Sequence, residues 1–194
     1  MPKILVLRLL LIDNYDSFTF NIVDLLRKLS FSYFTIKKND ELSVEEAQAF
    51  DHIIISPGPS IPTQSGNIID IIQQLAPTHK ILGICLGHQA IAEAFGAKLM
   101  NLKQPYHGFK THIKIIEEDI LFKNLPERFE VGLYHSWVVR EETLGSDLIA
   151  TSISDDDYVM SIKHKKYKVH GMQFHPESYM TEWGKQMLQN WLLY

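Results

Sequence analysis

Apolar segments alternate with amphipathic ones through the first half of this chain, and this alternation constrains the fold more than any other feature. Four apolar segments have the pattern of buried strands, at residues 4–12, 33–37, 52–56 and 80–84. Helical patterns follow them in turn, the first two after Ser17 and Ser43 and the others over residues 66–75 and 87–95. Strands that alternate with helices at short spacing predict an α/β fold, with a mostly parallel sheet covered by helices on both faces.

Local signals predict where individual helices begin and end. Ser17 is expected to cap the first helix, and Ser43 with Glu46 matches the capping-box pattern of a short second helix. Gly96 is expected to end the helix over residues 87–95. The apolar face of the first helix is expected to contain Phe20, Val23, Leu26 and Leu29, and to be widened by Ile22 and Leu25.

After Lys98 the pattern changes to short strands separated by turn signals. We expect these strands to form a small antiparallel addition and a return to the main sheet, followed by a C-terminal helix over residues 183–193. The strands are expected at residues 111–116, 129–133, 148–152, 159–164 and 168–174. Because no repeat, linker or low-complexity segment interrupts the sequence, residues 1–194 are expected to form a single domain.

Charge and composition argue against several classes of partner. The chain carries 19 basic and 23 acidic residues, net −4, without an aromatic and basic stripe, so we expect no nucleic acid partner. The most basic segment, residues 164–168, is expected to be a solvated hairpin turn. The apolar run at residues 4–12 is much shorter than the roughly 18 residues that a membrane span needs, and no cleavage site follows it. With one cysteine the chain can form no internal disulfide, which fits a reducing, cytoplasmic location.

That cysteine, Cys85, lies between two glycines where an apolar strand meets a helix. Gly83-Ile84-Cys85-Leu86-Gly87 therefore has the pattern of a nucleophile elbow, with cysteine in place of serine. The helix N-terminus would favour a thiolate at Cys85 and leave the Leu86 N–H free for a developing oxyanion. The alternative is a small buried cysteine beside two incidental glycines, and the local pattern favours the nucleophile.

A cysteine nucleophile needs a base and a group that orients the base, and the segment from Gln173 to Glu177 offers both. Pro176 favours an extended conformation at His175, and in extended chain His175 and Glu177 would point the same way. Glu177 could then hold one ring nitrogen of His175 while the other faces Cys85. Eight other histidines are present. His135, beside Tyr134 and Ser136, is the one serious rival, and His88 is expected to point away from Cys85. No metal or other cofactor is expected, because the single cysteine is not grouped with histidines at ligand spacing.

Taken together, these residues resemble the class I glutamine amidotransferases, a family with a flavodoxin-like α/β fold. Three segments carry the resemblance, at residues 56–59, 82–90 and 171–178, and the match covers essentially the whole chain from Leu10 onward. The opening residues 12–21 and the turn Tyr134–Trp137 further resemble the amidotransferase subunits of anthranilate synthase and aminodeoxychorismate synthase. The resemblance implies that Cys85, His175 and Glu177 form a catalytic triad.

The same resemblance implies a site for L-glutamine. The N–H groups of Gly58 and Leu86 would form the oxyanion hole, in a loop that also contains Pro59 and Ser60. Gln89 and the backbone of Ser136 and Trp137 would orient the substrate. Three departures from the family pattern occur, at Ser60 (usually glycine), at Trp137 (usually leucine) and in residues 107–111, which hold one extra residue.

The implied reaction is hydrolysis of glutamine by Cys85, with the ammonia passed to a chorismate-binding synthase subunit. The amidotransferase pattern fills the chain and leaves no room for a domain that activates an acceptor, so the resemblance implies such a partner. Two alternatives remain, an independent hydrolase of γ-glutamyl bonds and a catalytically silent regulatory subunit. The sequence does not decide between anthranilate and aminodeoxychorismate as the product.

Overall fold

The computed structural model describes residues 7–194, and within them nine strands join in one sheet while two more form a small separate sheet. The strands are β1 (Leu9–Asp13), β2 (Phe34–Lys38), β3 (His52–Ile55), β4 (Lys80–Ile84), β5 (Leu99–Asn101), β6 (Phe109–Ile115), β7 (Arg128–Leu133), β8 (Trp137–Val139), β9 (Leu148–Ser154), β10 (Val159–His164) and β11 (Val169–Met172). The α-helices are α1 (Thr19–Lys28), α2 (Val44–Ala47), α3 (Ile68–Leu75), α4 (Leu86–Ala94) and α5 (Gly184–Leu193). Three 3₁₀ helices complete the elements: η1 (Pro62–Gln64), η2 (Ile120–Phe122) and η3 (Glu141–Thr143).

The large sheet has a parallel part and an antiparallel part, in the order β2-β1-β3-β4-β11-β10-β9-β6-β7. Strands β2, β1, β3, β4 and β11 are parallel, and each later strand pairs antiparallel with its neighbour. The parallel part has the flavodoxin-like strand order, whose ligand sites lie beyond the carboxyl ends of the strands. The expected α/β class and the return to the main sheet, made by β11, are confirmed.

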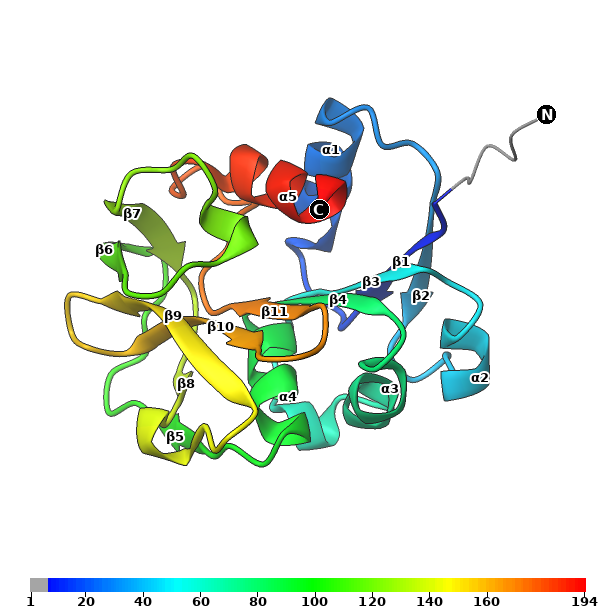
Figure 1. Cartoon of the computed structure of the whole chain (residues 1–194), viewed down its shortest axis with the longest axis horizontal. Helices are drawn as coiled ribbons and strands as arrows, with labels where there is room; N and C mark the ends of the chain where they lie inside the picture. The colour runs from blue at the N-terminus through cyan, green and yellow to red at the C-terminus, as the bar shows by residue number, and fades with distance from the viewer. Residues whose placement is uncertain (1–6) are drawn as a thin grey trace.

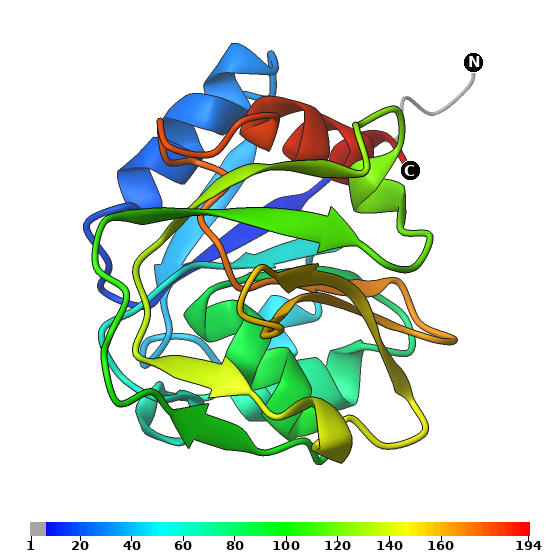
Figure 2. The same cartoon turned by 90° about the vertical axis from the view of Figure 1, so that its left-hand side faces the viewer.

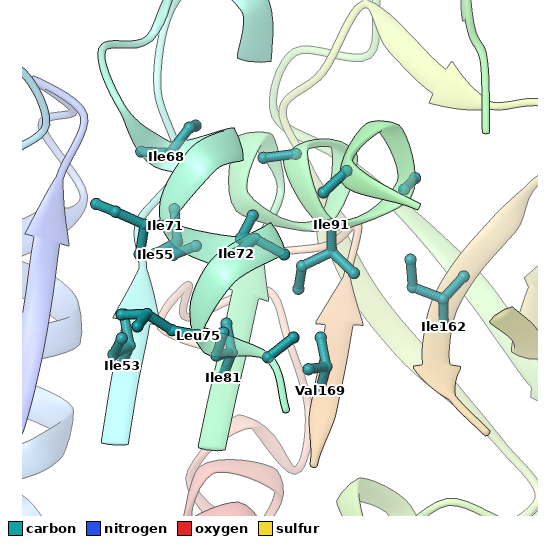
Figure 3. Packing of buried hydrophobic residues seen from close by; sticks show 14 of the residues in the cluster. Ile53, Ile55, Ile68, Ile71, Ile72, Leu75, Ile81, Ile91, Ile162 and Val169 are labelled. Carbon is teal, nitrogen blue, oxygen red and sulfur yellow. The ribbon is translucent and has the colours of Figure 1, made fainter. Parts of the chain in front are cut away.

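Helices cover both faces of the parallel strands (Figures 1 and 2). Helices α1 and α5 lie on one face, and α2, α3 and α4 lie on the other. All five residues of β1 and all five of β4 are buried, because these strands are covered on both sides. Figure 3 shows one of the two cores, in which α3 contributes Ile68, Ile71, Ile72 and Leu75 against Ile53, Ile55, Ile81 and Val169 of the strands.

Most of the helix-boundary predictions are confirmed, and one is wrong. The Ser43 hydroxyl accepts a hydrogen bond from the Glu46 N–H at 3.2 Å, and the Glu46 carboxylate accepts one from the Ser43 N–H at 2.9 Å. Gly96 ends α4 with φ +88°. Ser17 does not cap α1, because the helix starts one residue later, at an N-cap Phe18 without a side-chain bond.

The predicted buried face of α1 needs one correction. Thr19, Ile22, Val23 and Leu26 are buried, whereas the Phe20 side chain is 69% exposed. The buried positions follow the helical spacing of three and four residues, and Phe20 lies one residue outside that stripe.

Two strand predictions also need correction, and one small sheet was not predicted. The strand predicted for residues 4–12 begins at Leu9, and residues 4–6 lie outside the described residues. The small sheet of β5 and β8 was not predicted, because each strand has only three residues. The strand predicted for residues 168–174 ends at Met172, so Gln173 and the residues after it follow their own path beyond the sheet edge.

Candidate active site

Cys85 lies at the sharp turn between β4 and α4, with φ 51° and ψ −99°. A non-glycine residue with positive φ is strained, and such strain is common where a side chain must project from a turn. The Cys85 N–H donates to the Met172 carbonyl at 2.7 Å, which ties the turn to β11. A Cβ at Gly83 would lie 2.2 Å from the Gly87 carbonyl oxygen, so glycine alone allows α4 to turn this tightly back onto β4.

His175 and Glu177 form a buried pair beyond the carboxyl end of β11. The ring Nδ1 of His175 lies 2.7 Å from Glu177 Oε1, and the two side chains are 2% and 0% exposed. Burial lowers the pKa of His175, but Glu177 and Cys85 beside the ring outweigh it, so that its pKa is well above the ordinary value. The rings of Phe18 and Tyr134 pack against the imidazole with centroids at 5.2 and 4.9 Å, which fixes its orientation.

The pairing agrees with the expectation from sequence, but its geometric reason differs. Pro176 and Glu177 lie in a turn rather than in extended chain, closed by a Ser178 N–H donating to the His175 carbonyl at 3.2 Å. The Thr181 hydroxyl donates to the same carbonyl at 2.6 Å. Where the turn returns to α5, a Cβ at Gly184 would lie 1.8 Å from the Pro176 carbonyl oxygen. The start of α5 therefore packs directly on the backbone of the turn that carries Glu177.

Cys85 and His175 line the same cavity, of about 750 Å³, at the carboxyl ends of the parallel strands. This volume lies within the range of about 300–1,000 Å³ that is usual for small-molecule sites. Of the predicted substrate-binding residues, the cavity is lined by Gly58, Pro59, Ser60, Gln89, Ser136 and Trp137. Leu86 and Glu177 do not line it, because the Leu86 side chain is buried beneath Gly58 and Glu177 lies behind the imidazole.

The loop that carries Gly58 packs directly on the start of α4. A Cβ at Gly58 would lie 2.4 Å from Leu86 Cδ2 and 2.8 Å from Asn14 Cβ, so the two backbone segments adjoin. Within residues 7–194 neither the Gly58 N–H nor the Leu86 N–H donates a hydrogen bond, which leaves both for a ligand. Two free N–H groups beside a thiol can donate hydrogen bonds to the oxyanion that forms when the thiolate attacks a carbonyl carbon.

Asn14 holds this loop in place and is a site residue whose role the sequence did not predict. Its backbone N–H and side-chain amide donate to Ser56 Oγ and to the Ser56 carbonyl, at 2.9 and 2.8 Å. Asn39 donates to Asn14 Oδ1 at 3.0 Å. At the unusual position Ser60, the hydroxyl donates to Gln64 Oε1 of η1 at 3.2 Å. The opening segment that resembled the family thus supports the loop at Gly58.

A chain of side-chain amides joins Cys85 to the start of β8. Gln89 Nε2 donates to the Trp137 carbonyl at 2.9 Å and to Gln173 Oε1 at 3.2 Å. Gln173 Nε2 in turn donates to Cys85 Sγ at 3.7 Å. With both its hydrogens used, Gln89 keeps its own Oε1 to accept a bond from a ligand N–H. Gln173 was missed as a contact of Cys85, although its position two residues before His175 was a signal.

Two other histidines were considered from the sequence, and the structure separates them from His175. His135 lines the cavity, but among residues 7–194 no carboxylate bonds to its ring. Its Nδ1 lies 3.1 Å from the Trp137 carbonyl, and burial is the main cause that lowers its pKa to about 4. His88 is fully buried against Gly171, away from the cavity, and burial lowers its pKa to about 3. Both rings are therefore neutral near pH 7.

Among residues 7–194 there is no cluster of three or more histidine, cysteine or acidic side chains placed to hold a metal ion. No helix in the same part of the chain is long and apolar enough to cross a membrane. The cavity brings together a thiol, an oriented imidazole and free backbone N–H donors. Such a set can carry out acyl transfer through a covalent thioester.

The family model of glutamine amidotransferase class-I matches residues 10–194 of the chain. The chain belongs to the class I glutamine amidotransferases. As in the resemblance drawn from the motifs, this family assignment extends over both halves of the fold, including the antiparallel strands.

Individual amidotransferases of this family are similar to the chain over almost their whole length. A candidate anthranilate synthase component II of Haemophilus influenzae is 44% identical over 186 residues, which cover 96% of each chain. The aminodeoxychorismate/anthranilate synthase component 2 of Bacillus subtilis is 37% identical and covers 95% of each chain. A crystal structure of a candidate GMP synthase subunit from Thermoplasma acidophilum superposes with a TM-score of 0.84 at 27% identity, covering 96% of this chain and 92% of that one.

Proposed function

We propose that this chain is the glutamine-hydrolysing subunit of an anthranilate or aminodeoxychorismate synthase. One observation carries the proposal: Cys85 and the Glu177-oriented ring of His175 face one cavity, at whose edge two backbone N–H groups are free. The named relatives, which are second components of such synthases, support the choice of synthase.

In the proposed reaction the Cys85 thiolate attacks the carboxamide carbon of L-glutamine. The carbonyl oxygen becomes an oxyanion that accepts hydrogen bonds from the Gly58 and Leu86 N–H groups. Collapse of this intermediate breaks the C–N bond, and the His175 imidazolium gives its proton to the departing ammonia. Water, deprotonated by His175, then attacks the γ-glutamyl thioester, so that glutamate leaves and the thiol is restored.

Glu177 acts in this scheme through His175 and does not touch the substrate. Its carboxylate accepts the Nδ1–H, so the other ring nitrogen faces Cys85, and it stabilises the charged ring between the two steps. Gln89 is assigned to binding, with its free Oε1 accepting a bond from an N–H of the substrate glutamine. The Ser136–Trp137 backbone and the loop at Pro59 and Ser60 would enclose the rest of the ligand.

The ammonia is proposed to pass to component I, a chorismate-binding synthase subunit, in the cytoplasm. The names of the relatives support this partner, since a second component implies a first. A reducing location is supported by the free Cys85, which must stay a thiol to react.

Mixing experiments test the proposal. The purified chain is combined with component I, chorismate and glutamine, and the aromatic product is identified by its mass as anthranilate or aminodeoxychorismate. Glutamate release is measured with and without component I and chorismate. No aromatic product with either class of component I would contradict the synthase assignment, and equal glutaminase rates in both conditions would favour an independent hydrolase.

A further inference from the structure

A second cavity of about 710 Å³ lies at the other end of β11 from the active site. The catalytic residues follow the carboxyl end of β11, whereas this cavity is lined by the β10–β11 hairpin before its amino end and by η2 with the residue after it. The hairpin is drawn in orange in Figure 1, beside β4. It contains the basic segment that was expected to be a simple solvated turn. The two cavities share no lining residue.

Positive charge is concentrated around this cavity. Five lysines line it: Lys123, Lys163, Lys165, Lys166 and Lys168. Within residues 7–194, only Lys163 has a carboxylate in ion-pair range, Glu117 at 3.6 Å. The chain as a whole has a net charge of −4, so the cluster does not reflect a generally basic surface. Glu118 also lines the cavity, but its carboxylate pairs with none of these lysines. The four lysines that lack a carboxylate partner repel each other, and a bound anion would relieve that repulsion.

The more buried part of the cavity contains an oriented histidine. His170 of β11 lines the cavity with its side chain 9% exposed, and its Nδ1 lies 3.0 Å from Asp119 Oδ1. The Asp119 side chain is 0% exposed and also accepts bonds from the Leu121 N–H at 3.0 Å and the Thr151 hydroxyl at 3.1 Å. Because this carboxylate accepts the Nδ1–H, the ring is held in one orientation and its Nε2 can contact a different partner. In the described part of the chain, the His170 ring makes its one hydrogen bond through Nδ1, and no protein group bonds to Nε2.

We propose that this cavity binds a phosphate group, either free phosphate or that of a small phosphate monoester. In this arrangement lysines reach the phosphate from two walls, Lys123 beside η2 and Lys168 beside β11, and the His170 ring, oriented by Asp119, contacts the same group through Nε2. Phosphate fits this arrangement better than a carboxylate does, because it carries more charge and has oxygens for donors from several directions. The site is independent of glutamine hydrolysis, so either proposal can fail without the other.

Two-dimensional ¹H–¹⁵N NMR of the full chain tests this inference, with inorganic phosphate as the probe and sodium chloride added to keep ionic strength constant. Saturable shifts are expected at the amides of residues 121–123 and 165–170, with a Kd of about 1 mM or lower. Glycerol 3-phosphate and glycerol are titrated in parallel. Tighter binding of glycerol 3-phosphate than of phosphate identifies a monoester as the ligand, equal affinity identifies the phosphate group alone, and glycerol should not bind.

Three variants locate the binding. His170→Gln and Lys168→Gln should each weaken phosphate binding roughly tenfold, the size expected for one charge-assisted contact. Lys185→Gln, on the exposed side of α5 and outside the cavity, is the matched control and should bind as the parent does. If His170→Gln does not fold, Lys168→Gln decides alone, since Lys168 is an exposed side chain. Shifts that do not saturate, or an unchanged affinity in Lys168→Gln, would overturn the proposal.

Discussion

The side-chain amide of Gln173 lies against the thiol of Cys85, with Nε2 3.7 Å from Sγ, and it is completely buried. Gln89 fixes its orientation by donating to Oε1, so the N–H side of the Gln173 amide must face the sulfur. A hydrogen bond to sulfur is stronger when the sulfur carries negative charge. Gln173 is therefore placed to stabilise the thiolate more than the thiol.

The first prediction concerns this contact. Gln173→Leu should slow alkylation of Cys85 by iodoacetamide at neutral pH, because the reacting sulfur loses a hydrogen-bond donor. A loss of about tenfold or more is expected from one charge-assisted bond. Gln73→Leu is the matched control, since Gln73 also donates from a partly buried amide, to the Ala94 carbonyl on the other side of the molecule. An unchanged alkylation profile in Gln173→Leu would assign Gln173 to packing alone.

The second prediction concerns the proposed nucleophile. Cys85→Ser should fold as the parent does, since the two side chains differ by one atom, and should lose glutamine-dependent synthesis by about three or more orders of magnitude. Synthesis by the mixed subunits should continue when ammonium salt replaces glutamine. Product formation with both nitrogen sources is measured by mass. Retention of even about a tenth of the glutamine-dependent rate would remove Cys85 from the mechanism.

The third prediction concerns the charge state of His175. Burial is the largest single influence on the pKa of His175, and it lowers that pKa. Among the groups that raise the pKa, Glu177 has the largest effect. Glu177→Gln should therefore lower the pKa of the His175 ring, as measured by NMR titration of the imidazole. Its loss of activity should be smaller than that of His175→Ala, because Glu177 orients the base without moving the proton.

The same pair has a consequence for stability with a definite sign. The pKa of His175 is higher in the folded chain than in the unfolded chain. The charged ring therefore stabilises the fold fully below about pH 6.5, and this stabilisation is lost as the pH rises through the folded-state pKa. The difference in unfolding free energy between parent and Glu177→Gln should therefore narrow at alkaline pH. A difference that grows with pH would contradict a charged His175.

The fourth prediction concerns the tight turn at Cys85. Gly83→Ala should destabilise the fold by about 3 kcal/mol or more, since its Cβ would meet the Gly87 backbone at 2.2 Å and backbone atoms cannot rotate away. Gly145→Ala is the control, with φ +68° but nothing within 4 Å of its Cβ, and should cost only the left-handed strain of about 1–2 kcal/mol. Urea unfolding measures both. Equal costs would mean that the backbone around Gly87 can shift to accept a Cβ, so that close approach does not require glycine at position 83.

The fifth prediction concerns the stability of the fold at acidic pH. His88 is fully buried and neutral, with a pKa lowered by burial to about 3 from the ordinary 6.5. The unfolded chain takes up a proton at this residue near pH 6.5 and the folded chain does not, so stability is complete above pH 6.5 and falls as the pH drops toward 3. His88→Leu should remove about 2 kcal/mol of the loss between pH 7 and pH 5. Urea unfolding at several pH values measures this, and parallel profiles over that range would contradict it.

Structural features that depend on residues close together in the chain were well predicted from the sequence. The alternation of strands and helices, the Ser43 capping box and the Gly96 ending depend on spacing over a few residues, and each is found in the structure. The glycines around Cys85 could be recognised for the same reason, because the elbow is built within five consecutive residues. Errors arose where a short signal competed with packing, as at Ser17 and Phe20, or where strands of three residues left no pattern, as in β5 and β8.

By itself, the sequence determined the α/β class, the elbow at Cys85 and the candidate residues His175 and Glu177. Only the tertiary structure decided how they are held: by a turn at Pro176, by Gln173 against the sulfur, and by Asn14 bonded to the loop at Gly58. It likewise brought His170 and the basic hairpin to one cavity. Local conformation follows from neighbouring residues, whereas a hydrogen bond between Asn14 and Ser56, 42 positions apart, exists only once the sheet has set their strands side by side.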